Sequence, residues 1–259
     1  VVLVYAEQGF GDTLQFARYL PLLARRGARG IVECPEALVG LISNVEGVEQ
    51  VVKIGDILPR YDFHIPMMSL PGVFKTNFDN IPATVPYITV PEESRIKWRN
   101  RLSIRDERPS IGLVWKGSDN HQRNDWRSPG LDKFHLLVKM EEFRWISLQK
   151  DDEVIDLAQF NFGERLTALG HEFEDFTDTA SAILNLDLVI SPDTAVAHLA
   201  GALAKPVWLV LPYSSEWRWF EDRADSPWYP TMKLFHQHIH GDWGGVVATI
   251  ATQLEEQVF

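Results

Sequence analysis

The sequence has few cysteines, no long apolar segment and no excess of basic charge, and each absence excludes a class of protein. Its single cysteine, Cys34, cannot form an internal disulfide, and no cysteine and histidine spacing typical of a zinc site is present. No apolar run approaches the ~18–20 residues of a membrane span, and no charged-then-apolar signal sequence opens the chain. We therefore expect a protein of the reducing cytoplasm that has no membrane span and binds no metal.

The shortage of basic residues also limits the partners of this protein. The 36 acidic side chains outnumber the 25 basic ones, which gives a formal net charge of −11. A general nucleic-acid-binding protein needs a basic face to release counterions from phosphates, so this class is excluded. The charge is uneven, because residues 1–107 carry a net charge of −1 and residues 108–259 carry −10.

What the chain does have is the composition of a folded protein. With 259 residues, 45% of them hydrophobic, it can bury the core of one large domain or two modest ones. Short apolar runs alternate with helical patterns, which predicts an α/β fold of parallel sheets with helical crossovers. A proline-rich stretch at residues 81–94 interrupts this alternation. We therefore expect two units, residues 1–105 and residues 106–259.

The expected elements follow the apolar periodicity. The predicted strands are residues 2–6, 31–34, 51–54, 62–65, 111–115, 145–148, 187–191 and 207–211. The predicted helices are residues 12–26, 36–43, 92–102, 132–140, 178–186, 194–203 and 243–258.

Ligands of such folds bind beyond the carboxyl ends of the parallel strands, where three loops of this sequence are expected. The first loop, residues 9–13, reads GFGDT, and its two glycines let the backbone turn sharply near a ligand. It lacks the third glycine of the dinucleotide fingerprint, because Leu14 stands there. Two interpretations of Asp12 stay open at this point, a helix N-cap and a general base.

The second loop, residues 116–128, is a local concentration of cations inside the acidic half. Cations and small hydroxyls after a strand suit a diphosphate, although a solvated surface loop has a similar composition. Its polar and basic side chains are Lys116, Ser118, His121, Arg123, Asn124, Arg127 and Ser128, opposed by Asp119 and Asp125.

The third loop, residues 191–198, follows a predicted strand and opens a predicted helix. Free backbone N–H groups at a helix N-terminus can bind an anion. Thr194 and His198 are four residues apart and share one face of this helix. The alternative is a tightly packed helix in which His198 is hydrogen-bonded inside the core.

Two further features carry less weight. His236, His238 and His240 alternate, so on a strand they would share a face, but no fourth zinc ligand lies at a characteristic spacing. The aromatic residues between residues 217 and 229 fit core or interface packing better than stacking on a sugar or base.

Taken together and in order, the loops resemble glycosyltransferase family 9, the heptosyltransferase-like group, in the form found after tetratricopeptide repeats in bacterial proteins. The segments that carry the resemblance are GFGDTLQFARYLPLL, WKGSDNHQRNDWRS, LDLVISPDTAVAHLAGALAKPVWLVLP, RADSPWYPTMKLFHQ and GDWGGV. The resemblance runs from Val2 to about Val247, and the segment SxDTxxAHLAGAL is its most specific part. It also implies that helical repeats precede Val1 in the full protein.

The resemblance implies a GT-B fold, in which two Rossmann-like domains face each other across a cleft. The first domain would be the acceptor side and the second would bind a nucleotide sugar, with the last helix packing back on the first as one option. The implied reaction is an inverting, metal-independent transfer from a nucleotide-diphosphate sugar to a hydroxyl of a glycan, lipid or protein. No cofactor is implied beyond this donor.

The same resemblance assigns site residues. Relative to the family pattern, Arg127 stands in place of a lysine and Ala195 in place of a glycine, which changes the geometry of the charge and the room for phosphate. The assignments are Asp12 as the catalytic base, and Gly11, Lys116, Ser118, Arg123, Arg127, Asp193, Thr194 and His198 as donor-binding residues.

Two other functions stay open from the residues themselves. One is a non-catalytic module that binds a nucleotide sugar or a partner for the repeats. The other is an NAD(P)-dependent dehydrogenase, which is disfavoured by the missing third glycine and by the lack of an acidic residue at the fingerprint spacing, although Glu33 lies close to it.

Overall fold

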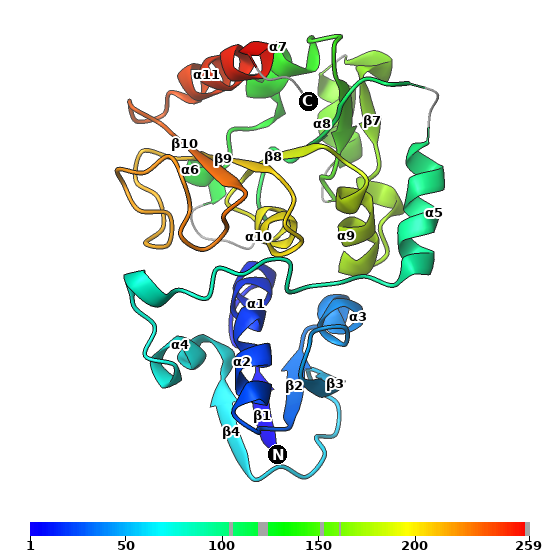
Figure 1. The fold of residues 1–259 in the computed structure, drawn as a ribbon. Helices are drawn as coiled ribbons and strands as arrows, with labels where there is room; N and C mark the ends of the chain where they lie inside the picture. Colours follow the sequence, from blue (N-terminus) through cyan, green and yellow to red (C-terminus); the bar gives the residue numbers. More distant parts are fainter. Residues whose placement is uncertain (104–105, 119–123, 151–152, 161, 257–259) are drawn as a thin grey trace.

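The computed structural model of the chain describes residues 1–103, 106–118, 124–150, 153–160 and 162–256. It contains two parallel β-sheets with helices packed on them, one below the other in Figure 1. We call residues 1–80, around the lower sheet, the first unit, and residues 106–256, around the upper sheet, the second unit. The chain boundary expected near residue 105 falls in a segment outside the described residues and stays a prediction.

The sheet of the first unit has four parallel strands in the order β3-β2-β1-β4. All four strands expected in this part of the sequence are present, and the central strand β1 places Val4 opposite Val32 and Ile65 in the core. The bounds are β1 Val2–Tyr5, β2 Gly30–Cys34, β3 Val48–Lys53 and β4 Phe63–Pro66.

The helices of the first unit are shorter than expected. The predicted helix at residues 12–26 is three successive elements, α1 Phe10–Phe16, the 3₁₀ turn η1 Ala17–Tyr19 and α2 Leu20–Arg25. Pro21 lies in the first turn of α2 and has no N–H for the preceding turn, so the helix is interrupted there. The remaining elements are η2 Glu36–Leu38, α3 Val39–Ile42, η3 Met67–Ser69, α4 Leu70–Val73 and η4 Phe78–Asn80.

The sheet of the second unit has six parallel strands in the order β10-β9-β8-β5-β6-β7. The two edge strands, β7 and β10, were not predicted, since β7 has three residues and β10 contains Lys233 and His236 among its apolar residues. The bounds are β5 Ser110–Leu113, β6 Arg144–Ser147, β7 Leu166–Ala168, β8 Leu188–Pro192, β9 Val207–Leu211 and β10 Met232–His236.

The helices of the second unit follow most of the expected pattern. The last helix, α11, packs on α7 and β10, and its buried residues join the apolar cluster of the second sheet. The option that it packs back on the first unit is therefore not the packing observed. The bounds are α6 Asn124–Arg127, η5 Leu131–Phe134, α7 His135–Val138, α8 Glu153–Gln159, η6 Gly163–Arg165, η7 Gly170–Glu172, α9 Phe176–Leu184, α10 Ala195–Ala202 and α11 Trp243–Glu256.

The strand order of the second sheet reverses between β5 and β8. Strands β5, β6 and β7 progress in one direction, and β8, β9 and β10 progress in the other. In open parallel sheets ligands bind outside the carboxyl ends of the strands at such a switch point. The second and third loops of the sequence, which follow β5 and β8, both lie there.

The two units are joined by buried contacts rather than by a linker alone. Helix α1 packs against α10, and α5 (Glu92–Leu102), which follows the proline-rich stretch, packs against α9 (Figure 1). The buried guanidinium of Arg18 donates to the carbonyl of Trp228 at 2.7 Å and to that of Pro82 at 3.3 Å. The main apolar cluster contains residues of both units, so it is continuous across the junction. Among the described residues, no helix combines the length and apolarity required to cross a bilayer.

Candidate active site

The amino end of α1 lies against α10, and Gly11 makes this approach possible. A Cβ atom built on Gly11 would lie 2.8 Å from Cδ2 of His198 and 3.7 Å from the Cα of Ala195. A side chain at this position would therefore force the two helices apart. The first and third loops of the sequence meet here, although nearly 190 residues separate them along the chain.

Asp12 lies in the first turn of α1 at the junction of the two units. The N-cap position of this helix is Gly9, and no side chain caps the helix, so the N-cap interpretation of Asp12 is wrong. Its Oδ1 atom instead accepts a hydrogen bond from Nη2 of Arg218 at 2.8 Å. Asp12 keeps 22% of its side-chain surface exposed, so its carboxylate remains accessible to a substrate.

Sequence reasoning missed Arg218. Its segment, residues 216–220, reads EWRWF, and its aromatic residues suggested core packing. The segment does pack in part, because Trp219 is fully buried and its ring centre lies 5.3 Å from that of His198. The available signal was an arginine between two tryptophans in an otherwise acidic segment, a setting in which a guanidinium stacks on aromatic rings.

Asp193, His198 and Tyr229 form a buried chain of polar groups behind the junction. Nε2 of His198 lies 3.5 Å from Oδ1 of Asp193, and Nδ1 lies 2.9 Å from the hydroxyl of Tyr229. Burial lowers the pKa of His198, which keeps the imidazole neutral. Because an ionised carboxylate only accepts hydrogen bonds, the proton lies on Nε2, and Tyr229 donates to Nδ1.

Asp193 stays ionised although its side chain is buried. Burial by itself would raise the pKa of Asp193, but its interactions with His198 and with the charge of Arg218 lower the pKa to about 2. Both ring nitrogens of His198 therefore have protein partners, and in this arrangement the imidazole orients Asp193. The alternative of a hydrogen-bonded histidine inside the core describes its geometry; the donor-binding assignment of His198 stays a prediction.

Thr194 occupies the N-cap position of α10, next to the switch point of the second sheet. Its side chain makes no capping bond to the helix, and its Oγ1 atom lies 2.9 Å from Oγ of Ser191. The first-turn N–H groups of α10 thus lack a side-chain cap at the place where an anion was expected.

Arg127 brings the second loop to the same junction. Burial lowers the pKa of Arg127, whereas the negative charges of Asp193, Glu216 and Asp12 raise it. Its Nε atom is buried and has no hydrogen-bond partner among the described residues. Arg127 therefore lies within electrostatic reach of both units and has one buried donor group unused.

For the other residues expected in the second loop, no hydrogen bond or ion pair with Asp12, Asp193 or Arg218 is observed among the described residues. Lys116 follows β5 and is half-buried, with its backbone N–H 3.2 Å from Oε1 of Gln149, and Ser118 is exposed. Arg123 and His121 lie outside the described residues. The structure thus brings together Gly11, Asp12, Arg127, Asp193, Thr194 and His198, and it adds Arg218.

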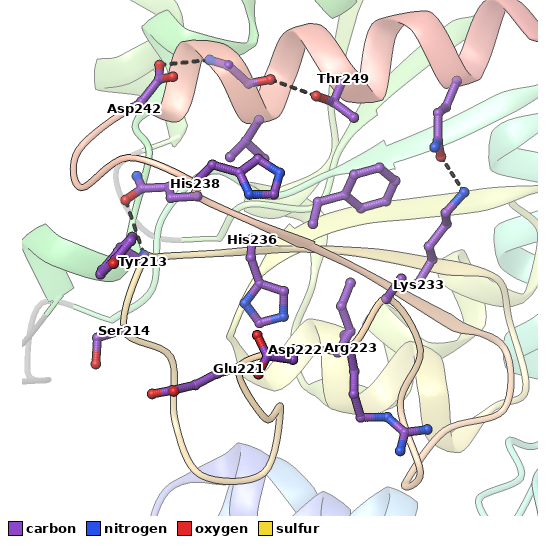
Figure 2. Close-up of a pocket in the computed structure, with 17 residues that line it drawn as sticks. Tyr213, Ser214, Glu221, Asp222, Arg223, Lys233, His236, His238, Asp242 and Thr249 are labelled. Carbon is purple, nitrogen blue, oxygen red and sulfur yellow. Dashed lines mark hydrogen bonds between the residues drawn. The ribbon is translucent and has the colours of Figure 1, made fainter.

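A separate groove of about 860 Å³ lies along β10 and the start of α11 (Figure 2). Its walls include His236 and His238, together with Glu221, Asp222 and Asp242. In the described part of the chain, no three histidine, cysteine, aspartate or glutamate side chains are arranged to hold a metal ion.

No family model matches the sequence. Protein FlbA of Caulobacter vibrioides is 23% identical over 281 residues, which cover 98% of this chain and 46% of FlbA. The chain thus spans about half the length of the curated relative that it matches, and the link to tetratricopeptide repeats stays a prediction.

Solved structures with the same fold are heptosyltransferases and a relative of them. E. coli ADP-heptose lipopolysaccharide heptosyltransferase II has a TM-score of 0.64 at 15% identity, with 99% of each chain covered. The family 9 glycosyltransferase of Veillonella parvula has a TM-score of 0.67 at 10% identity, covering 100% of this chain and 90% of that one. E. coli heptosyltransferase WaaC with ADP has a TM-score of 0.59 at 13% identity, with 98% of each chain covered. The predicted fold class is confirmed: the chain has the GT-B fold of the glycosyltransferase family 9 heptosyltransferases, with two Rossmann-like sheets.

Proposed function

We propose that this chain is an inverting glycosyltransferase that moves a sugar from a nucleotide-diphosphate sugar to an acceptor hydroxyl. One observation carries the proposal: the carboxylate of Asp12, from the first unit, accepts a hydrogen bond from Arg218 of the second unit at 2.8 Å, and its charge also opposes the burial that lowers the pKa of Arg127 in the loop after β5. This supports a base and two cations near the switch point of the second sheet, where ligands of such sheets bind. A solved structure with this fold, the heptosyltransferase TibC in complex with ADP-D-β-D-heptose, supports a donor of this class.

In the proposed reaction, Asp12 acts as the general base. The acceptor hydroxyl attacks the anomeric carbon of the donor and gives its proton to the carboxylate of Asp12. The bond between the anomeric carbon and the diphosphate oxygen breaks, and its electron pair leaves on the diphosphate. Attack from the side opposite the diphosphate inverts the anomeric carbon, and the transition state resembles an oxocarbenium ion.

The second unit would stabilise the charge that grows on the leaving diphosphate. The guanidinium of Arg127 matches the geometry of phosphate oxygens, and its buried Nε has no protein partner among the described residues. Lys116 and the N-terminus of α10 at Thr194 add positive potential, and such groups act most strongly where water is excluded. Asp193 stays negatively charged and would repel phosphate, so we assign it to the hydroxyls of the donor sugar.

Metal independence is part of the proposal. One solved structure of this fold, TibC of enterotoxigenic E. coli, is described as an iron-containing glycosyltransferase, with a TM-score of 0.58 at 12% identity over 95% of this chain and 65% of that one. In the proposed reaction, Arg127 and Arg218 would take the place of a metal ion at the leaving diphosphate. Chelator treatment that left transfer unchanged would support this part of the proposal, and loss of transfer restored by a metal would contradict it.

The test is a calorimetric titration with ADP-, UDP- and GDP-sugars, followed by an assay for release of the nucleoside diphosphate. We expect one donor class to bind and to release its diphosphate when an acceptor is present. Binding without turnover would support the non-catalytic module instead. Binding of NAD, without any nucleotide sugar, would support the dehydrogenase.

A further inference from the structure

The proposed base forms an ion pair with a cation of the second unit. Oδ1 of Asp12 and Nη2 of Arg218 are 2.8 Å apart, with 22% and 10% of their side chains exposed. One oxygen of the carboxylate therefore accepts a hydrogen bond from Arg218 and is not open to the hydroxyl of an acceptor. This ion pair opposes the role that the proposed function gives to Asp12.

Arg218 has other anionic and aromatic neighbours on the side of the second unit. Its positive charge helps to lower the pKa of Asp193 and that of Arg127. Its guanidinium lies 5.3 Å from the ring centre of Trp217. Its Nε atom is buried and has no hydrogen-bond partner among the described residues. The guanidinium thus contacts the base of the first unit and has one buried donor group unused.

We propose that Arg218 is a positioning residue that moves from Asp12 to the diphosphate when the donor binds. This inference rests on the proposed function. A diphosphate has a higher negative charge than a carboxylate, and its oxygens suit the fork of N–H donors on a guanidinium. Transfer of Arg218 to the donor releases the carboxylate of Asp12, so the base becomes available only in a complex that already contains the sugar to be transferred.

A fixed arrangement is the competing interpretation. If Arg218 stays on Asp12 and only joins the two units, the charges of both residues act on a bound diphosphate independently. Removing Asp12 then changes diphosphate binding by the same factor whether or not Arg218 is present. If Arg218 instead moves from Asp12 to the diphosphate, the effects of removing Asp12 and of removing Arg218 are coupled. The reason is that donor binding by the wild type then includes the loss of the ion pair.

The experiment is a double-mutant cycle on the binding of ADP, UDP and GDP, measured by calorimetry with the full chain. Asp12→Asn is expected to tighten binding of the preferred diphosphate about tenfold, the scale of one buried charged hydrogen bond. Arg218→Met is expected to weaken binding by about tenfold or more. In the Arg218→Met background, the gain from Asp12→Asn should shrink to about twofold or less.

Two further variants control for folding and for general charge. Arg223→Met removes an arginine five residues away that pairs with Asp225, and it should leave diphosphate binding unchanged. Arg218→Lys keeps the charge without the fork, so it should recover part of the affinity, and it replaces Arg218→Met if that variant does not fold. Steady-state kinetics should show a raised KM for the donor in Arg218→Lys, with the KM for the acceptor unchanged.

The outcomes separate this inference from the proposed function. If Asp12→Asn changed diphosphate binding equally in the wild type and in Arg218→Met, the proposed movement of Arg218 would be overturned. The glycosyltransferase proposal would remain intact. A wild-type chain that binds none of the three diphosphates would overturn both.

Discussion

The two units of this protein have related sheets but contribute differently to the site. The first unit has four parallel strands and carries a net charge near zero, whereas the second has six strands and most of the negative charge. Yet the first unit provides the acid, Asp12, and the acidic second unit provides the cations, Arg127 and Arg218. If the proposed site is correct, a few local cations, and not the overall charge of the unit, attract the anionic donor.

The two units also pack closely against each other at their junction. The proposed reaction needs groups from both, and Gly11 and Arg18 each allow or make a contact across the junction.

The first unit should contribute the proton acceptor, Asp12, which favours catalysis but not donor binding. Asp12→Asn should lower kcat by about 10³-fold, within the range of a lost general base, because the amide cannot take the proton. The measurement is acceptor-dependent release of the diphosphate at saturating donor. Asp56→Asn, which changes an exposed carboxylate of the same unit, is the matched control and should keep full activity. Wild-type rates in Asp12→Asn would remove the catalytic role of the first unit.

The contact between the units should depend on Arg18. Arg18→Met leaves the carbonyls of Trp228 and Pro82 without their donor and should reduce the free energy of unfolding by about 3 kcal/mol. Chemical denaturation measures this change. Arg25→Met, which removes an exposed ion pair with Glu46, should change stability by about 0.5 kcal/mol or less. Equal effects of the two variants would show that the buried arginine does not hold the units together.

The second unit should contribute stabilisation of the leaving group. Arg127→Met should lower kcat by about 10²-fold, the effect of losing one preorganised donor to a developing anion. Lys139→Met, an exposed cation of the same unit, is the control for net charge. A large rise in the donor KM with unchanged kcat would instead show that Arg127 only binds the ground state.

The buried acid of the second unit should make stability depend on pH. The pKa of Asp193 is about 2 in the folded state against an ordinary 3.8. Between these two pH values the unfolded chain therefore binds more protons at this residue than the folded chain does. Its contribution of about 2 kcal/mol is fully present above pH ~4 and is lost as the pH falls toward 2.

Asp193→Asn measures this contribution. Denaturation at several pH values should show the difference in stability between wild type and Asp193→Asn shrinking by about 2 kcal/mol between pH ~4 and ~2. Asp56→Asn should show no such change with pH. A difference that stayed constant across this range would mean that Asp193 is not held in its charged form by His198 and Arg218.

Much of the fold was predictable because it depends on local periodicity. All four strands of the first sheet and the central strands of the second follow apolar runs, which are readable along the chain. The edge strands β7 and β10 escaped prediction because an edge strand is short or partly polar and shows no such run. The break at Pro21 was also readable in principle, since proline cannot donate to the preceding turn.

The candidate site was predictable only in part. Asp12, Arg127 and Asp193 follow strands or open helices, so their general location follows from the topology of parallel sheets. Arg218 follows no strand directly and belongs to an irregular segment. Its contact with Asp12 spans 206 positions and arises only when α1 and α10 pack together.

The sequence by itself determined the α/β class, the two sheets and the position of three polar loops, because strand and helix periods and turn residues are local properties. It also showed that cations are scarce and concentrated. Only the tertiary structure decided which groups face each other: Asp12 with Arg218, and His198 with Asp193 and Tyr229. The physical reason is that these partners come from distant segments, and packing of the buried junction sets their distances.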